Sequence, residues 1–164
     1  MLAAARLVSL VGPGGVGKTR LAGRLATDLA RGFAGGGWWV SLAEVRQPGQ
    51  VAGALMTGLD VHDQEGTDPT QLLMSRLRVS ALLLVLDNCE HLLSTAAAMV
   101  DDILRAAPQV RVLVTSREPL QVSGEYVLPV PPLGLPPANG GLSLDQLQQN
   151  EAVSLFVERA RSAT

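Results

Sequence analysis

A run of glycines followed by lysine and threonine is the feature of this sequence with the clearest chemical consequence. Residues 12–19 read Gly-Pro-Gly-Gly-Val-Gly-Lys-Thr and match the spacing G-x-x-x-x-G-K-[ST]. Glycines let successive backbone N–H groups converge on one anion, and a helix opening at Lys18 adds the positive end of its dipole. Lys18 could reach β- and γ-phosphates, and Thr19 could offer its hydroxyl to Mg²⁺. The predicted phosphate-binding residues are Gly12, Gly14, Gly15, Val16, Gly17, Lys18, Thr19 and Arg20.

A carboxylate that could hold the metal follows the most apolar segment of the chain. Residues 82–86 read Leu-Leu-Leu-Val-Leu and are followed by Asp87. Ligands of parallel sheets bind at the carboxyl ends of buried strands, which is where this carboxylate would lie. We therefore predict that Thr19 and Asp87 form the metal site. The alternative is that Asp87 caps a helix beginning near Asn88.

The rest of the chain alternates short apolar runs with stretches of helical period, which predicts an α/β fold around a parallel sheet. Residues 81–86 show no polar alternation, as expected of a strand covered on both faces. Prolines between 129 and 137 indicate an extended connector, so we predict a nucleotide-binding core at 1–130 and a connector with the start of a helical lid at 131–164. The expected strands are 6–11, 38–42, 81–86, 110–115 and 125–130, and the expected helices are 19–31, 51–59, 70–79, 90–107, 143–149 and 150–161.

Three segments together resemble one protein family. They are the glycine-rich loop continued by Arg-Leu-Ala, the sequence Asp-Asn-Cys-Glu-His-Leu-Leu at 87–93, and Val-Thr-Ser-Arg-Glu-Pro-Leu at 114–120. In combination they resemble the STAND class of signal-transduction ATPases, with an NB-ARC-like domain as in bacterial AfsR-like and large LuxR-like regulators. The resemblance covers nearly the whole chain. It implies a three-layer P-loop NTPase fold, with helices on both faces of a five-stranded parallel sheet in the order 5-1-4-3-2.

The resemblance also implies a role for the end of the fourth strand. In the family this strand lies between the phosphate-loop strand and the metal strand and reads the γ-phosphate. Arg117 then becomes the sensor arginine, with Thr115 or Ser116 as a polar contact. An arginine in that place can pair with terminal phosphate oxygens. Without the resemblance, a surface arginine beside Glu118 is an equal interpretation.

This sequence departs from the family in two ways, one that bears on ATP hydrolysis and one that bears on whether all the nucleotide contacts of the family are present. Many relatives carry a second acid directly after the metal-binding Asp, whereas this chain has Asn88, which cannot accept a proton from water. Glu90 is then the remaining candidate for orienting water, or else a carboxylate favoured by a helix dipole. The family places further nucleotide contacts before the first strand and in a following lid, so we expect this chain to be a fragment of a larger protein.

Composition excludes several classes of function. The net charge of −2 gives no basic field that would draw the chain to nucleic acid or an anionic membrane. Cys89 is the single cysteine, which excludes an internal disulfide or a multi-thiolate zinc site and favours a cytoplasmic location. We interpret Cys89 as a packed thiol and His91 as a helix-surface residue.

These observations predict an ATP/ADP-binding switch module of a multidomain bacterial regulator of transcription, with slow Mg²⁺-dependent ATP hydrolysis. The alternative is a P-loop kinase acting on a small molecule or nucleotide. The expected partners are nucleotide and the neighbouring lid and effector domains of the same chain. Leu155 and Phe156 give the ending an apolar face on which self-association could rest.

Overall fold

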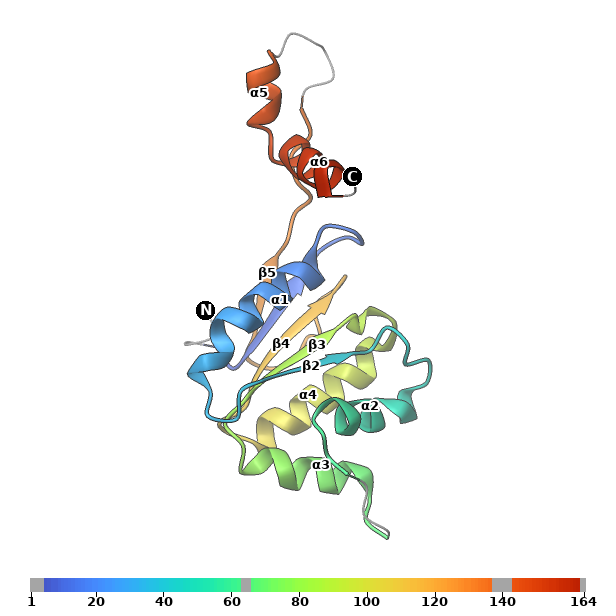
Figure 1. Cartoon of the computed structure of the whole chain (residues 1–164). Helices are drawn as coiled ribbons and strands as arrows, with labels where there is room; N and C mark the ends of the chain where they lie inside the picture. The colour runs from blue at the N-terminus through green and yellow to red at the C-terminus, as the bar shows by residue number, and fades with distance from the viewer. Residues whose placement is uncertain (1–4, 63–65, 137–142, 163–164) are drawn as a thin grey trace. The chain divides into compact units, whose positions relative to one another are not determined.

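The computed structural model of this chain describes residues 5–62, 66–136 and 143–162. It divides into two compact units, Met1–Val130 and Pro131–Thr164. Within the described residues, the strands of the first unit are β1 (Leu7–Val11), β2 (Gly37–Ser41), β3 (Leu83–Asp87), β4 (Arg111–Ser116) and β5 (Glu125–Pro129) (Figure 1). Its helices are α1 (Lys18–Leu29), α2 (Val51–Gly58), α3 (Pro69–Arg78) and α4 (Leu93–Ala106), with 3₁₀ turns η1 (Ala30–Gly32), η2 (Pro48–Gln50) and η3 (Cys89–Leu92).

The strand order brings three strand ends together at one edge of the sheet. All five strands are parallel and run in the order β2-β3-β4-β1-β5, which confirms the predicted order read in reverse. β4 pairs with β1 as far as Val11↔Ser116, and with β3 as far as Leu86↔Val114. The loop after β1, the last residue of β3 and the residue after β4 are therefore neighbours.

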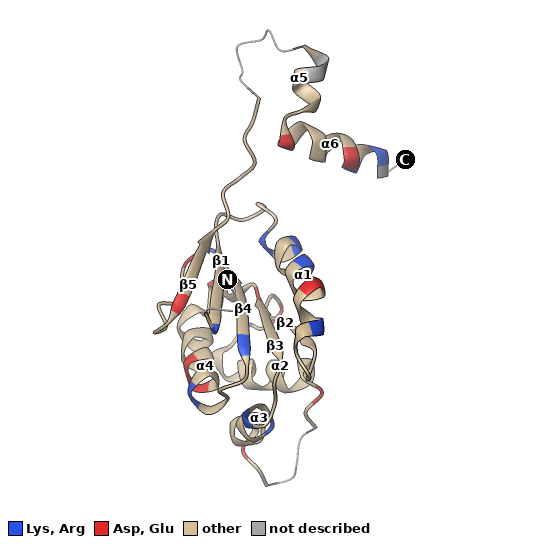
Figure 2. Ribbon diagram, turned by 90° about the vertical axis from the view of Figure 1, so that its left-hand side faces the viewer, with Lys and Arg blue, Asp and Glu red and all other residues tan. Residues whose placement is uncertain are grey.

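Both faces of the central strands are buried. Leu84 and Leu86 pack in the larger core cluster, to which α2, α3 and α4 contribute, whereas Leu83 and Val85 pack with Ala22 of α1. Figure 2 shows α1 and α4 on opposite sides of the sheet. Burial on both faces explains why this segment is apolar without alternation.

Local signals account for the helix starts. The helix expected at 70–79 is present as α3, which begins one residue earlier: Pro69 is its first residue, and the Asp68 side chain caps it by accepting a hydrogen bond of 3.0 Å from the N–H of Gln71. The helix expected from residue 90 begins as η3, and the α-helix proper starts at Leu93. Asn88 has a left-handed φ of 63°, so the chain turns sharply between β3 and η3.

The second unit contains two helices among its described residues, α5 (Leu144–Gln148) and α6 (Glu151–Ser162). The Asn150 side chain caps α6 by accepting hydrogen bonds of 3.1 and 3.3 Å from the N–H groups of Ala152 and Val153. Phe156 is 74% exposed, and Leu155 is also exposed. Across the described part of the chain, none of the helices is both long and apolar enough to span a bilayer.

Candidate nucleotide-binding site

The glycines of the loop between β1 and α1 are required by the backbone itself. Gly15 and Gly17 have φ of 80° and 93°, in the left-handed region, and Gly17 is the N-cap of α1. A Cβ on Gly12 would lie 2.3 Å from the carbonyl oxygen of Val130, so a side chain there would displace the backbone. The loop is thus a tight turn that leads into the N-terminus of α1, whose first N–H groups lack intrahelical partners and can bind an anion.

Lys18 lies inside this loop. The residue is only 8% exposed, and its amine donates hydrogen bonds of 2.8 Å and 2.9 Å to the carbonyl oxygens of Gly12 and Pro13. The loop therefore holds one positive charge at its centre, bonded to neutral acceptors. Phosphate oxygens are stronger partners for an ammonium group than carbonyls are, because both partners are then ionised.

Asp87 is joined to the first turn of α1 and to β4. Its Oδ1 accepts a hydrogen bond of 2.9 Å from the Thr19 hydroxyl and one of 2.5 Å from the Thr115 hydroxyl. The carboxylate is almost completely buried, at 4% exposed. One hydroxyl and one carboxylate side by side fit Mg²⁺, which takes few protein oxygens and completes its shell with phosphate and water. The predicted metal pair, Thr19 and Asp87, is therefore chemically suitable.

Arg117 reaches across the loop from the end of β4. A Cβ on Gly14 would lie 3.4 Å from Nη2 of Arg117, so the guanidinium packs directly against that glycine. The Arg117 Nε also forms an ion pair of 3.3 Å with Oε1 of Glu90. The other oxygen, Oε2, is buried and has no hydrogen-bond partner among the described residues. Arg117 thus lies beside the phosphate loop and is paired with Glu90.

Arg20 and Ser116, two other predicted residues, are not among the side chains that bond to Asp87 or pack on the loop in the described part of the chain. Arg20 is exposed in the first turn of α1, and the Ser116 hydroxyl accepts a hydrogen bond of 3.3 Å from the N–H of Glu118. Cys89 and His91 lie close to Asp87 in the sequence. Burial, reinforced by the negative charges of Glu90 and Asp87, raises the pKa of the Cys89 thiol to about 12, so the thiol stays protonated near neutral pH. His91 is exposed, and its Nε2 lies 2.8 Å from the Val45 carbonyl oxygen. Both residues have the environments that the sequence predicted.

Sequence reasoning missed the bond between Thr115 and Asp87. The resemblance directed Thr115 toward phosphate, whereas its side chain contacts the Asp87 carboxylate on the neighbouring strand. The strand order 5-1-4-3-2 already made these two strand ends adjacent, so that order was the available signal.

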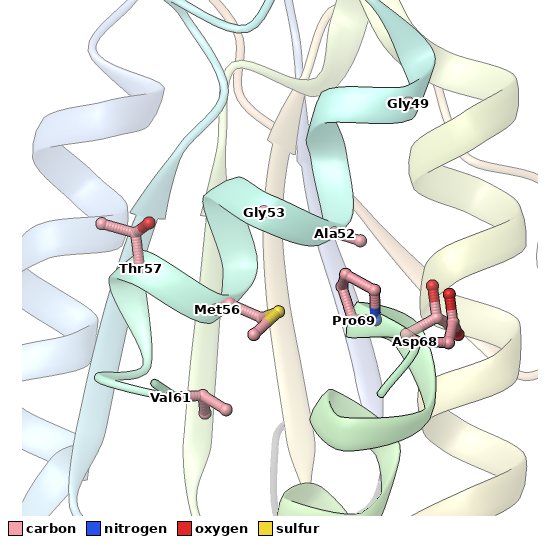
Figure 3. Close-up of a pocket in the computed structure, with 9 residues that line it drawn as sticks. Gly49, Ala52, Gly53, Met56, Thr57, Val61, Asp68 and Pro69 are labelled. Carbon is pink, nitrogen blue, oxygen red and sulfur yellow. The ribbon is translucent and has the colours of Figure 1, made fainter. Parts of the chain in front are cut away.

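A separate cavity of about 580 Å³ lies between α2 and α3 (Figure 3). Among the described residues that line it, Asp68 is the one ionisable residue, and its side chain already caps α3. The described residues contain no group of three or more His, Cys, Asp or Glu side chains able to hold a metal ion. The cavity is lined by Gly49, Ala52, Gly53, Met56, Thr57, Val61, Asp68, Pro69 and Thr70.

Two solved structures share this architecture. Cdc6p from Pyrobaculum aerophilum superposes with a TM-score of 0.60 at 18% identity, over 96% of this chain and 43% of that one. The Aeropyrum pernix ORC2 protein, solved as ADPNP–ADP complexes, superposes with a TM-score of 0.52 at 17% identity, over 79% of this chain and 44% of that one. The chain has the P-loop NTPase fold. No family model matches it.

The P-loop chain also has relatives among curated proteins. It is 37% identical over 161 residues to "Uncharacterized protein Rv0894" of Mycobacterium tuberculosis, covering 98% of this chain and 38% of that protein. It is 39% identical over 162 residues to "Putative HTH-type transcriptional regulator Rv0890c" of the same organism, covering 98% of this chain and 16% of that protein. The chain thus spans less than half the length of these relatives.

Proposed function

We propose that this chain is an ATP/ADP-binding switch module of the STAND class, with an NB-ARC-like domain, that works within a multidomain bacterial regulator of transcription and hydrolyses ATP slowly with Mg²⁺. The observation that carries the proposal is the hydrogen bond of 2.9 Å between Thr19 and Asp87. It joins the hydroxyl that ends the phosphate loop to the buried carboxylate at the end of β3. These two groups are what a P-loop site uses to hold Mg²⁺ beside nucleotide phosphates.

Each side chain then has a defined task. The loop N–H groups and Lys18 bind the phosphates, and Thr19 and Asp87 hold Mg²⁺, which supplies charge neutralisation at the phosphate oxygens. Arg117 lies against the loop and can pair with the terminal phosphate. Because ADP lacks that phosphate, Arg117 would pair differently in the ATP and ADP states, and such a difference is what a switch requires.

Slow hydrolysis is supported by the acids near Asp87. Asn88 occupies the next position and cannot accept a proton from water. Glu90 is paired with Arg117 through Oε1, so this carboxylate must leave the arginine before it can orient a water molecule. We therefore propose Asp87, Glu90 and Arg117 as the residues on which turnover depends, at a rate well below the common enzyme scale of about 10 s⁻¹.

The place of the module in a larger regulator is supported by the relatives. One of them is named as an HTH-type transcriptional regulator, and the matching segment is 16% of its length. We propose that the nucleotide state is read by lid and effector domains, and that the cytoplasm is where the regulator works. The exposed Phe156 of α6 would contact such a neighbour or a second copy.

Calorimetric titration of the 164-residue chain with ATP and ADP, with Mg²⁺ or with a chelator, tests the proposal. We expect both nucleotides to bind and Mg²⁺ to strengthen ATP binding. Asp87→Asn should keep the fold and lose the magnesium effect, because an amide lacks the charge that a hard cation requires. A variant that responds to Mg²⁺ like the unmodified protein would remove Asp87 from the metal site.

A phosphate-release assay on protein shown to be monomeric by light scattering tests the switch assignment. Turnover at ordinary enzyme rates would contradict it. Transfer of phosphate to an added small molecule or nucleotide, in place of release to water, would instead support a P-loop kinase.

A further inference from the structure

Thr115 forms two hydrogen bonds that the proposed nucleotide site leaves unexplained. The residue is 1% exposed, and its hydroxyl donates to Oδ1 of Asp87 at 2.5 Å. The Thr115 hydroxyl oxygen, Oγ1, also accepts a hydrogen bond of 3.0 Å from the backbone N–H of Asn88. The Thr115 hydroxyl thus donates its one proton and accepts through a lone pair, so it cannot rotate without breaking a hydrogen bond.

These bonds fix two parts of the site. Oδ1 of Asp87 accepts hydrogen bonds from the hydroxyl groups of Thr19 on α1 and Thr115 on β4, which restrain the orientation of the carboxylate. The bond to Asn88 stabilises the left-handed residue, with φ of 63°, at which the chain leaves β3 for η3. Glu90 lies in η3, so the position of that carboxylate also depends on this turn.

We propose that Thr115 is a positioning residue that sets the magnesium affinity of the site by orienting Asp87. The inference rests on the proposed function. A carboxylate held by a donated hydrogen bond presents its free lone pairs in one direction and does not have to be ordered when the cation binds. Groups that orient metal ligands in this way typically change metal affinity 10–100-fold when they are removed.

A purely structural role for the hydroxyl is the competing explanation. Ser9 on the neighbouring strand β1 provides the comparison, because it is 0% exposed and its hydroxyl has no hydrogen-bond partner among the described residues. A buried hydroxyl in this sheet is therefore tolerated without any bond. Thr115 differs from Ser9 in contacting the metal carboxylate, and this difference can be measured.

The experiment measures ADP affinity by calorimetry over a series of Mg²⁺ concentrations and in a chelator. Thr115→Val keeps the shape and strand preference but removes the hydroxyl, so we expect the half-effective Mg²⁺ concentration to rise about 10–100-fold. Affinity in the chelator should change less than about twofold, since the phosphate loop is untouched. Thr115→Ser should restore the magnesium response, and the matched control Ser9→Ala should leave it unchanged.

Three results would overturn the inference: an unchanged magnesium response in Thr115→Val, an equal loss in Thr115→Ser, or an equal loss of affinity in the chelator. Should Thr115→Val not fold, Thr115→Ala and Thr115→Ser repeat the comparison, because they differ only by the hydroxyl. If the unmodified protein binds ADP with no magnesium effect, the proposed function fails, and the inference with it. A magnesium effect lost in Asp87→Asn but kept in Thr115→Val overturns the inference alone.

Discussion

The middle of the central strands and their carboxyl ends are equally buried but are built from opposite kinds of residue. In β4, Leu113 is 0% exposed and Thr115 is 1% exposed; in β3, Leu84 is 0% exposed and Asp87 is 4% exposed. The apolar residues gain free energy by leaving water, whereas the polar ones lose it unless each is bonded. Burial by itself therefore does not distinguish a structural position from a functional one.

The polar ends share a feature that the apolar middle lacks. Their hydrogen bonds converge on one carboxylate, which connects α1, β3 and β4. The middle residues divide between two clusters on opposite faces of the sheet. We therefore expect substitutions in the middle to lower the free energy of unfolding, and substitutions at the ends to lower nucleotide affinity in a protein that stays folded.

The largest expected effect is at the middle of β3. Leu84→Ala removes a fully buried side chain and should lower the free energy of unfolding by about 2–5 kcal/mol, from the lost burial and the cavity left behind. Denaturant unfolding followed by circular dichroism measures the change. Val79→Ala is the control, because Val79 is 80% exposed and should shift stability by less than about 0.5 kcal/mol. Equal effects of the two substitutions would contradict the proposed core.

Lys18→Ala should weaken nucleotide binding while leaving the stability of the fold almost unchanged. Removing the ammonium group should weaken ATP binding by about 2–4 kcal/mol, because charge-assisted bonds in a partly desolvated loop are lost. The thermal midpoint should move little. Arg24→Ala removes a positive charge from an exposed part of the same helix and should leave ATP affinity nearly unchanged. Calorimetry showing unchanged affinity in Lys18→Ala would refute the phosphate-loop assignment.

Arg117→Ala should weaken ATP binding more than ADP binding. We propose that Arg117 pairs with the γ-phosphate, which ADP lacks, so ATP affinity should fall by about 1.5 kcal/mol, the lower end for a charged hydrogen bond, because the Arg117 side chain is 64% exposed. ADP affinity should fall by less. Paired titrations measure the difference, and an equal loss for both nucleotides would show that Arg117 does not sense the terminal phosphate.

Glu90→Gln should have the smallest effect, and in the opposite direction. The substitution removes the carboxylate that pairs with Arg117 and leaves the guanidinium available to phosphate, so ATP affinity should rise by up to about 1 kcal/mol. Low-salt calorimetry is the sensitive measurement, because screening weakens such pairs. A fall in ATP affinity would mean that Glu90 supports the loop and does not compete for Arg117.

Much of the fold could be predicted because its signals are local. The apolar run of β3 implies burial on both faces whatever surrounds it, and Asp68 followed by Pro69 starts a helix by its own chemistry. The start of α4 could not be predicted in this way. The left-handed Asn88, after which the 3₁₀ turn begins, donates its backbone N–H to Thr115, a residue of another strand.

The sequence by itself determined the phosphate loop, because its glycines, lysine and threonine are contiguous and act through their own backbone. It also placed Asp87 at the end of a buried strand. Only the tertiary structure decided that Thr115 bonds to Asp87, that Arg117 packs on Gly14 and pairs with Glu90, and that Gly12 lies against Val130. These contacts join segments distant in the chain, and their geometry follows from strand order and register, which no local pattern encodes.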